Sequence, residues 1–432
     1  MSSNKVELLS PAGNLEKLKI AFKYGADAVY GGVSHFSLRI RSGKEFTYES
    51  FKEGIDYAHS LGKKVYATIN GFPFNSQIEL LKKHIIQMAE LEPDALIVAA
   101  PGVVRLCREL APNIPIHLST QANVMNYLDA QVYYDMGVRR IIAAREISLK
   151  DVVEIKKHLP DMEIEIFVHG SMCFAYSGRC LVSAVQMGRV PNRGSCANDC
   201  RFEYTLYAAN EDHSSLFRLE EEPGVGTYIF NAKDMNLASH LDEILACGAV
   251  DSVKIEGRTK SPYYAAVTAY AYRQAIDDFY TDSFKSSKYQ EELATTKNRG
   301  FTDAYLIHRP FEKNDTQNHE YALSKGSYEV SGLVTEDEKH FLCKYKTYPN
   351  EETEIFAPFG TEIEEIDNDI GSIYKKDDGK YYVCFKKILT ETNKELESVH
   401  SGNTNKIQLP GRLPYLTMLR VENTDQECCD NQ

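Results

Sequence analysis

The chain has 432 residues, of which 43% are hydrophobic and 26% are charged, an ordinary composition for a folded globular protein. The start, MSSNKVELLSPAG, lacks the basic beginning and long apolar run of a signal peptide, and no stretch approaches a membrane span. The net charge of −13 disfavours nucleic-acid binding over the whole surface, because phosphate contacts require lysine and arginine. We therefore expect a cytoplasmic protein without membrane contact, whose ten cysteines are reduced or bound to metal.

Between residues 5 and 275, short apolar runs alternate with stretches of helical period. The apolar runs predict strands at residues 6–9, 28–30, 65–69, 95–99, 116–118, 141–143, 163–168 and 253–255. The periodic stretches predict helices at residues 15–24, 48–61, 76–91, 102–111, 127–136, 148–158, 235–246 and 262–280. Near-continuous apolar strands indicate a parallel sheet covered on both faces, and eight of them favour a TIM-like (β/α)8 barrel. No G-x-G-x-x-G motif follows the first strand, which disfavours a dinucleotide-binding fold.

A cysteine-rich insertion follows the seventh predicted strand, within the segment 165–201. The strand is expected to break at His169-Gly170, and the spacing C-x6-C-x15-C-x3-C then places Cys173, Cys180, Cys196 and Cys200. Four thiols in a loop rich in glycine suit a soft metal or an iron–sulfur cluster. Buried apolar cysteines are the alternative, but the intervening residues are small, polar or basic. Zinc sites usually show shorter C-x2–4-C pairs on both sides, so the first spacing favours an iron–sulfur cluster.

Polar side chains gather where the predicted strands end, which is where TIM barrels place their active sites. They comprise Ser10, Tyr30, Asn70, Ser119, Thr120, Gln121, Asn123, Arg145, Glu146, His169, Lys254, Glu256 and Arg258. An anionic small molecule suits the cations, and the expected substrate-binding residues are Arg145, Lys254, Arg258, Asn70 and Gln121. Glu256 is expected to orient one of the cations or a substrate hydroxyl, or simply to pair with Lys254. The predicted catalytic residues are His169, Glu165 and Glu256, although a satisfied loop histidine is the commoner case.

Four arginines lie in the cysteine segment among few acidic residues: Arg179, Arg189, Arg193 and Arg201. A solvated loop is one interpretation, and a basic rim that contacts RNA phosphates is the other. We expect the RNA-binding rim, with Arg299 and Phe301 as a second contact where an aromatic ring could stack on a base.

The hydrophobic period changes to two after about residue 328, which predicts a small C-terminal antiparallel β-barrel domain at residues 327–421. Its Cys343 and Cys384 are expected to be core residues. The catalytic barrel is expected at residues 1–283, a linker region at 284–326 and a flexible tail at 422–432. Within the barrel domain, the acidic residues 211–226 predict an exposed connection.

Several motifs together carry a resemblance to a known family. They are E-x-F-x-H-G-S-M-C-x6-C-x-x-S from Glu165, ELLSPAG from Glu7, GADAVY-x-G from Gly25, KIEGR from Lys254 and NRGFT from Asn298. They resemble the collagenase-like peptidase family, and within it the bacterial prephenate-dependent tRNA uridine hydroxylases. With the β-rich end, the likeness covers nearly the whole chain.

The resemblance implies a four-iron four-sulfur (4Fe-4S) cluster on Cys173, Cys180, Cys196 and Cys200. It implies hydroxylation of carbon 5 of the wobble uridine of certain tRNAs, without molecular oxygen and with prephenate as co-substrate. In related ubiquinone hydroxylases one cluster ligand lies near the position of Met235, and this chain has no cysteine there. Whether the protein needs a partner protein stays open at this point.

Two alternatives stand beside this interpretation. A branch of the family that hydroxylates a ribosomal RNA cytidine is typically longer than this chain. The family label suggests a peptidase, but the chain contains neither H-E-x-x-H nor G-x-S-x-G. Cys173 with His169 resembles a nucleophile and its base, although four clustered cysteines favour ligation as the use of that thiol.

Overall fold

The computed structural model describes residues 5–33, 36–38, 45–209, 216–219, 230–308, 316–318, 326–402 and 404–423. The chain divides into two compact units. The first comprises Met1–Phe22, Ala26–Glu291 and Asn298–Lys325. The second comprises Lys23–Gly25, Glu292–Lys297 and Gly326–Gln432.

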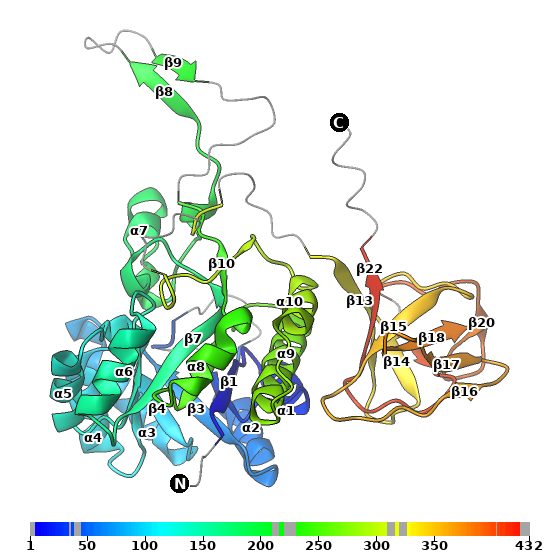
Figure 1. The fold of residues 1–432 in the computed structure, drawn as a ribbon, viewed down its shortest axis with the longest axis horizontal. Helices are drawn as coiled ribbons and strands as arrows, with labels where there is room; N and C mark the ends of the chain where they lie inside the picture. The colour runs from blue at the N-terminus through cyan, green and yellow to red at the C-terminus, as the bar shows by residue number, and fades with distance from the viewer. Residues whose placement is uncertain are drawn as a thin grey trace. The chain divides into compact units, whose positions relative to one another are not determined.

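The first unit is a closed barrel of eight parallel strands, as predicted (Figure 1). The strands are β1 (Glu7–Pro11), β2 (Ala28–Gly31), β3 (Lys64–Ile69), β4 (Ala95–Val98), β5 (Ile116–Leu118), β6 (Arg140–Ile142), β7 (Glu163–Ser171) and β11 (Ser252–Ile255). The barrel closes because β11 pairs in parallel with both β1 and β7. Nearly every residue of these strands is buried, which explains why the strands read as continuous apolar runs.

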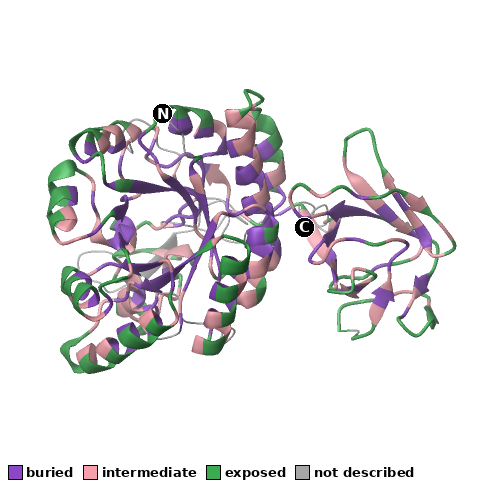
Figure 2. Ribbon diagram, turned by 90° about the horizontal axis from the view of Figure 1, so that it is seen from below, coloured by how far each residue is buried: buried purple, intermediate pink, exposed green. Residues whose placement is uncertain are grey.

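Helices alternate with the strands and surround the barrel. They are α1 (Leu15–Lys23), α2 (Tyr48–Ser60), α3 (Ile78–Glu90), α4 (Pro101–Leu110), α5 (Tyr127–Asp135), α6 (Leu149–His158), α8 (Leu241–Ala246) and α9 (Pro262–Tyr280). Helix α2 illustrates how the local sequence determines a helix. Thr47 caps its start, and Phe51, Ile55 and Ala58 form its buried face. Figure 2 shows the same division around the barrel, with buried strands inside and exposed outer helix faces. A further helix, α10, spans Ser286–Ala294.

The seventh strand is longer than predicted. It does not break at His169-Gly170 but continues to Ser171, because β10 (Asp234–Asn236) pairs antiparallel with residues 169–171. A partner far away in the sequence therefore extends the strand beyond its apolar run. Gly170 has a φ of +112°, and a Cβ atom there would lie 2.4 Å from the Glu256 carbonyl oxygen. The predicted helix 235–246 is correspondingly wrong in its first part, since β10 precedes α8 and pairs with β12 (Phe301–Thr302).

The cysteine segment follows β7 directly, as predicted. It forms short turns and one helix, α7 (Val182–Met187), before the hairpin of β8 (Leu206–Ala209) and β9 (Leu216–Leu219). Of the predicted exposed connection 211–226, residues 216–219 form β9, and the others lie outside the described residues.

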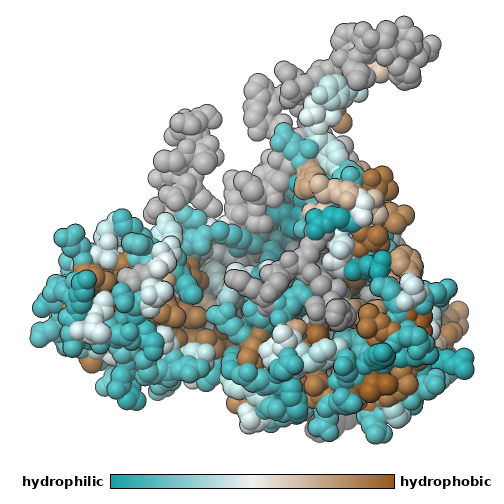
Figure 3. Space-filling model, turned by 180° about the vertical axis from the view of Figure 1, so that it is seen from behind, coloured by the Kyte–Doolittle hydropathy of each residue, from teal (hydrophilic) through white to brown (hydrophobic). Residues whose placement is uncertain are grey.

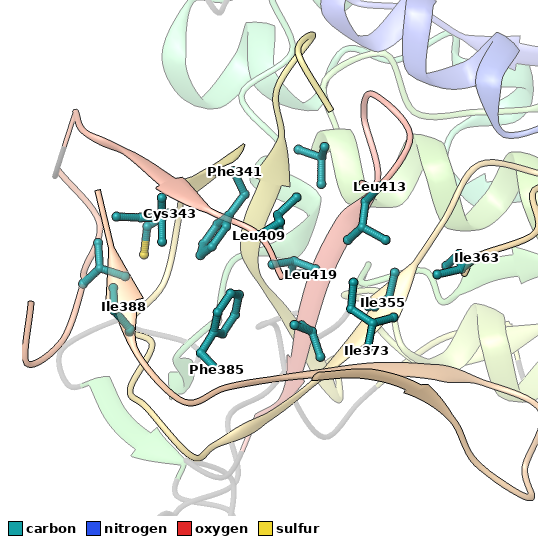
Figure 4. Packing of buried hydrophobic residues seen from close by; sticks show 14 residues of the cluster. Phe341, Cys343, Ile355, Ile363, Ile373, Phe385, Ile388, Leu409, Leu413 and Leu419 are labelled. Atoms are coloured by element: carbon teal, nitrogen blue, oxygen red, sulfur yellow. The ribbon is translucent and has the colours of Figure 1, made fainter. Parts of the chain in front are cut away.

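The second unit contains a curled antiparallel sheet in the order β16-β17-β18-β15-β22-β13-β14-β21. Its strands are β13 (Tyr328–Val334), β14 (His340–Cys343), β15 (Glu352–Phe356), β16 (Ile366–Asp367), β17 (Gly371–Lys375), β18 (Tyr381–Phe385), β21 (Lys406–Gln408) and β22 (Met418–Glu422). A small second sheet pairs β19 (Ile388–Leu389) with β20 (Glu395–Leu396). The core of the second unit contains Phe341, Phe385 and Leu419, which pack beside Cys343 (Figure 4). Cys384 is half-buried. Most of the predicted tail, residues 424–432, lies outside the described residues.

Candidate functional site

A cavity of about 390 Å³ opens among the loops that follow the barrel strands. All the predicted substrate-binding residues and Glu256 line it: Asn70, Gln121, Arg145, Lys254, Glu256 and Arg258. The cysteine segment supplies the rest of the wall, with Arg201 and all four predicted ligand cysteines. Among the described lining residues, four cations and one carboxylate therefore face one cavity in an acidic chain. This balance suits a small organic acid with more than one negative charge.

A network of buried ions inside the barrel supports the cavity. Lys254 Nζ donates to Glu165 Oε1 at 2.7 Å, and Arg140 Nη1 donates to Glu165 Oε2 at 3.3 Å. Arg140 also pairs with Glu7. Burial lowers the pKa of Lys254, although the Glu165 carboxylate opposes this shift. Glu165, a predicted catalytic residue, thus lies outside the cavity lining and contacts it through Lys254, whose ammonium is 4.2 Å from the centroid of the Tyr30 ring.

Arg145 and Glu256 form the second ion pair of the site. Arg145 Nη2 donates to Glu256 Oε2 at 3.1 Å, and both side chains are nearly buried. The guanidinium carbon of Arg145 lies 4.1 Å from the centroid of the Phe167 ring. Glu256 therefore orients Arg145, whereas Lys254 pairs with Glu165.

Arg258 and Asn70 bind residues 36–38, which follow β2. Arg258 Nη1 donates to Ser37 Oγ at 2.6 Å and to Thr68 Oγ1 at 2.9 Å, and its Nη2 donates to the Leu38 carbonyl. Asn70 Oδ1 accepts a hydrogen bond from Leu38 N at 3.2 Å. Arg258 thus holds part of the cavity wall in place as well as presenting charge to the cavity.

His169 does not line the cavity, which contradicts its predicted place beside the substrate. Strict alternation after Phe167 would direct its ring into the barrel, but a β-bulge in the pairing of β7 with β11 interrupts the alternation. The imidazole packs instead against Tyr264, Tyr272 and Phe301, with ring centroids 5.6–5.8 Å apart. Burial lowers the pKa of His169 to about 3, so the ring is neutral at pH 7.

The four predicted ligand cysteines are free, half-buried thiols on one wall of the cavity. Val182 N donates to Cys180 Sγ at 3.3 Å, and Asn198 N donates to Cys196 Sγ at 3.4 Å. Burial raises the pKa of the Cys200 thiol; the Arg201 charge opposes this shift, and the charges of the other three thiols add to it. Four thiols that line one cavity, two of which accept hydrogen bonds from backbone N–H groups, are of the ligand type that iron–sulfur clusters use. Among the described residues, no three His, Cys, Asp or Glu side chains are arranged to hold a single metal ion.

The four predicted RNA-binding arginines have different surroundings. Arg201 lines the cavity and Arg189 is exposed. Arg193 lies over the Phe74 ring, 4.5 Å from its centroid. Arg179 Nε donates to the Gln121 carbonyl oxygen at 2.7 Å. The basic residues therefore extend from the cavity wall to the surface of the segment.

The predicted second RNA contact is not available at Arg299. This side chain is 1% exposed, pairs with Asp234 and donates from Nε to the Ala232 carbonyl oxygen at 3.0 Å. It joins β10 to β12, and Phe301 packs on His169. The segment expected to contact RNA is thus a packed junction in which Arg299 is buried and Phe301 is half-buried.

Sequence reasoning missed Arg140, which binds three glutamates from inside the barrel: Glu7, Glu163 and Glu165. A signal was present, because glutamates at alternate positions of an otherwise apolar strand point to charged partners in the barrel interior.

The fold and the site together define the class of this protein. It is a TIM-like barrel whose mouth carries clustered cations and a cysteine-rich wall. The chain belongs to peptidase family U32, which it matches over residues 13–316. It is 64% identical over 419 residues to tRNA hydroxylation protein P of Helicobacter pylori strain J99, covering 97% of this chain and 99% of that protein. The Escherichia coli K12 protein of the same name is 40% identical over 82% of this chain and 87% of its own length. The collagenase of Porphyromonas gingivalis strain W83 is 30% identical over 71% of this chain and 75% of its own length.

In the part of the chain that the structure describes, each helix is too short or too polar to cross a membrane.

Proposed function

We propose that this chain is a tRNA hydroxylase that acts on carbon 5 of the wobble uridine, without molecular oxygen and with prephenate as the hydroxyl source. The observation that carries the proposal is the shared cavity, which is lined both by four cysteines and by the cations Arg145, Lys254 and Arg258. The relatives named tRNA hydroxylation protein P align over most of the chain and support tRNA as the substrate. A tRNA substrate in turn supports a cytoplasmic location.

The four cysteines of the cavity wall would hold a 4Fe-4S cluster: Cys173, Cys180, Cys196 and Cys200. When bound, such a cluster supplies electron transfer that side chains do not offer. The backbone N–H groups that donate to Cys180 and Cys196 stabilise thiolate charge at this wall. The other lining residues of the cavity are left for substrate.

The cations of the barrel mouth suit the two carboxylates of prephenate. Arg145 offers a planar fork, and its contacts with Phe167 and Glu256 fix the direction of that fork before substrate arrives. Lys254 supplies a point charge and is held in place by Glu165. Glu256 is the one carboxylate among the described lining residues, and its ion pair with Arg145 leads us to assign it the role of positioning that guanidinium group.

The test is anaerobic incubation of the iron-loaded protein with prephenate and unmodified tRNA, followed by nucleoside mass spectrometry. We expect hydroxylated uridine that depends on both the protein and prephenate. Arg145→Lys keeps the charge but loses the fork, so its KM for prephenate should rise more than its kcat falls. Absence of hydroxylated uridine with the iron-loaded wild type would contradict the proposal.

A peptidase is the competing function, and the geometry does not favour it. His169, the candidate base for Cys173, is neutral and enclosed by tyrosine and phenylalanine rings outside the cavity lining. Gelatin hydrolysis by the same preparation is the direct check. Gelatin hydrolysis that persists in Cys173→Ser and does not correlate with the iron content of the preparation would show a contaminating protease.

A further inference from the structure

The outer surface of the cysteine segment is unusually apolar. Six of the sixteen large apolar side chains that are exposed in the described chain lie between residues 172 and 205. We call this set the rim face: Phe174, Tyr176, Leu181, Val185, Met187 and Phe202. Figure 3 shows hydrophobic residues gathered on this part of the molecule. Leu181 and Val185, one helical turn apart at α7, are 67% and 82% exposed.

The fold maintains this exposure by burying the other side of the segment. Ser183 of α7 is buried and its Oγ accepts a hydrogen bond from Ala197 N at 3.0 Å. Val182 and Cys180 line the cavity. The thiols and the polar anchor therefore lie on the cavity side of the segment, whereas Leu181 and Val185 are exposed on its outer surface.

The charge around the rim face suits a polyanion. Residues 172–205 contain four arginines but only Asp199 and Glu203 as acids, and Asp199 is buried, in a chain of net charge −13. Arg193 stacks on Phe74, which is itself 57% exposed. Aromatic rings beside arginines are the combination that binds unpaired nucleotides, because bases stack on rings while phosphates contact guanidinium groups.

The rim face is also continuous with the cavity. Phe174 is 55% exposed and at the same time lines the cavity, as Arg201 does beside Phe202. A base that enters the cavity past the cysteine wall brings its neighbours in the strand onto this surface. A nucleotide in an unpaired loop can make that movement at a cost of only a few kcal/mol.

We propose that the rim face is a stacking surface for the unpaired nucleotides on either side of the base that enters the cavity. The proposal rests on the proposed function and adds a binding surface to it. Aromatic stacking supplies affinity that the few phosphate contacts of an acidic protein do not.

The test is binding of an anticodon stem-loop RNA that carries a fluorescent adenine analogue next to the wobble position. Tyr176→Ala and Phe202→Ala should each weaken binding roughly 5- to 150-fold and restore fluorescence that stacking quenches. Tyr176→Phe keeps the ring and should retain wild-type affinity. The control is Tyr345→Ala, an aromatic residue of the second unit that is 44% exposed and should have no effect.

The salt dependence separates stacking from charge. The slope of log Kd against log salt should stay unchanged in Tyr176→Ala, since this variant keeps every arginine that faces phosphate. It should fall by roughly 0.7 for each phosphate interaction that Arg189→Ala/Arg193→Ala removes. Val185→Ser removes no buried side chain and gives a second variant in which folding is not at risk. Iron content and far-UV circular dichroism verify each variant.

The outcomes are distinct. If the wild type hydroxylates tRNA but the ring-removing variants bind with unchanged Kd, the stacking surface is refuted and the proposed function stands. If these variants instead dissociate a dimer in light scattering and leave RNA affinity unchanged, the rim face is a protein interface and the inference is wrong. If the wild type neither binds nor modifies RNA, both proposals fail.

Discussion

Replacement of Glu165 by glutamine should destabilise the barrel strongly, because Glu165 is fully buried. Its carboxylate is fully buried and lies 2.7 Å from Lys254 Nζ. The change leaves the Lys254 ammonium, whose side chain is 4% exposed, without its nearest counter-charge. We expect the free energy of unfolding to fall by about 3–5 kcal/mol, which is the usual cost of removing one partner of a buried pair.

The magnitude follows from two opposing contributions. At an effective dielectric constant of about 20, charges 2.7 Å apart attract by roughly 6 kcal/mol. Desolvation of the buried ions offsets part of this attraction, so the intact pair contributes little net stability while the broken pair is costly. Removing both charges in Glu165→Gln/Lys254→Met should therefore recover most of the lost stability.

The pH dependence supplies an independent check. The pKa of Lys254 in the folded barrel is already lowered by burial, and Glu165→Gln lowers it further. Wherever the unfolded amine is protonated and the folded amine is neutral, stability rises with pH by up to about 1.4 kcal/mol per unit. This rise ends at the ordinary lysine pKa of 10.5. Below that value, the variant should show it over a wider pH range than the wild type does.

The assay is urea unfolding of the iron-free protein, followed by far-UV circular dichroism at several pH values. Glu163→Gln is the matched control, because Glu163 lies on the same strand and binds Arg140 at 2.7 Å, but its side chain is 49% exposed. It should cost less than about 1 kcal/mol. A loss below about 1 kcal/mol in Glu165→Gln, or no recovery in the double variant, would show that the buried ion pair does not behave in this way.

Three further predictions address the site. Cys200→Ala should lose most bound iron while the barrel stays folded, whereas Cys343→Ala, in the core of the second unit, should keep wild-type iron; equal iron contents would refute the ligand assignment. Arg258→Ala should reduce hydroxylation, with partial rescue by excess prephenate; activity equal to wild type would exclude a binding role. In the folded protein His169 has a pKa of about 3, so its ring stays neutral at pH values where the unfolded chain binds a proton. The free energy of unfolding should therefore fall by up to about 1.4 kcal/mol per pH unit as the pH drops below 6.5. His169→Gln should flatten this fall and exposed His158→Gln should not; an unchanged slope would show that His169 is not the buried neutral base described.

The sequence was sufficient where local pattern determines structure. The apolar runs of the barrel strands, the caps of helices such as α2 and the spacing of Cys173, Cys180, Cys196 and Cys200 all depend on neighbours along the chain. The pattern thus predicted the barrel and the cysteine-rich insertion after its seventh strand.

Long-range pairing determined what local pattern could not predict. The extension of β7 depends on β10, which lies more than sixty residues later, and the β-bulge opposite β11 turns His169 away from the cavity. Arg299 looks like a surface arginine until Asp234 is found beside it. Periodicity within one segment does not encode such partners.

In the proposed function, the cysteines and cations of one cavity support hydroxylation of a tRNA base. The most direct measurement uses prephenate with heavy oxygen in its hydroxyl group, anaerobic iron-loaded protein and unmodified tRNA, with mass spectrometry of the wobble nucleoside. We expect a uridine that carries one added heavy oxygen with the wild type and none with Cys200→Ala. An unmodified uridine with the wild type, or a hydroxyl group that carries no label, would contradict the claim.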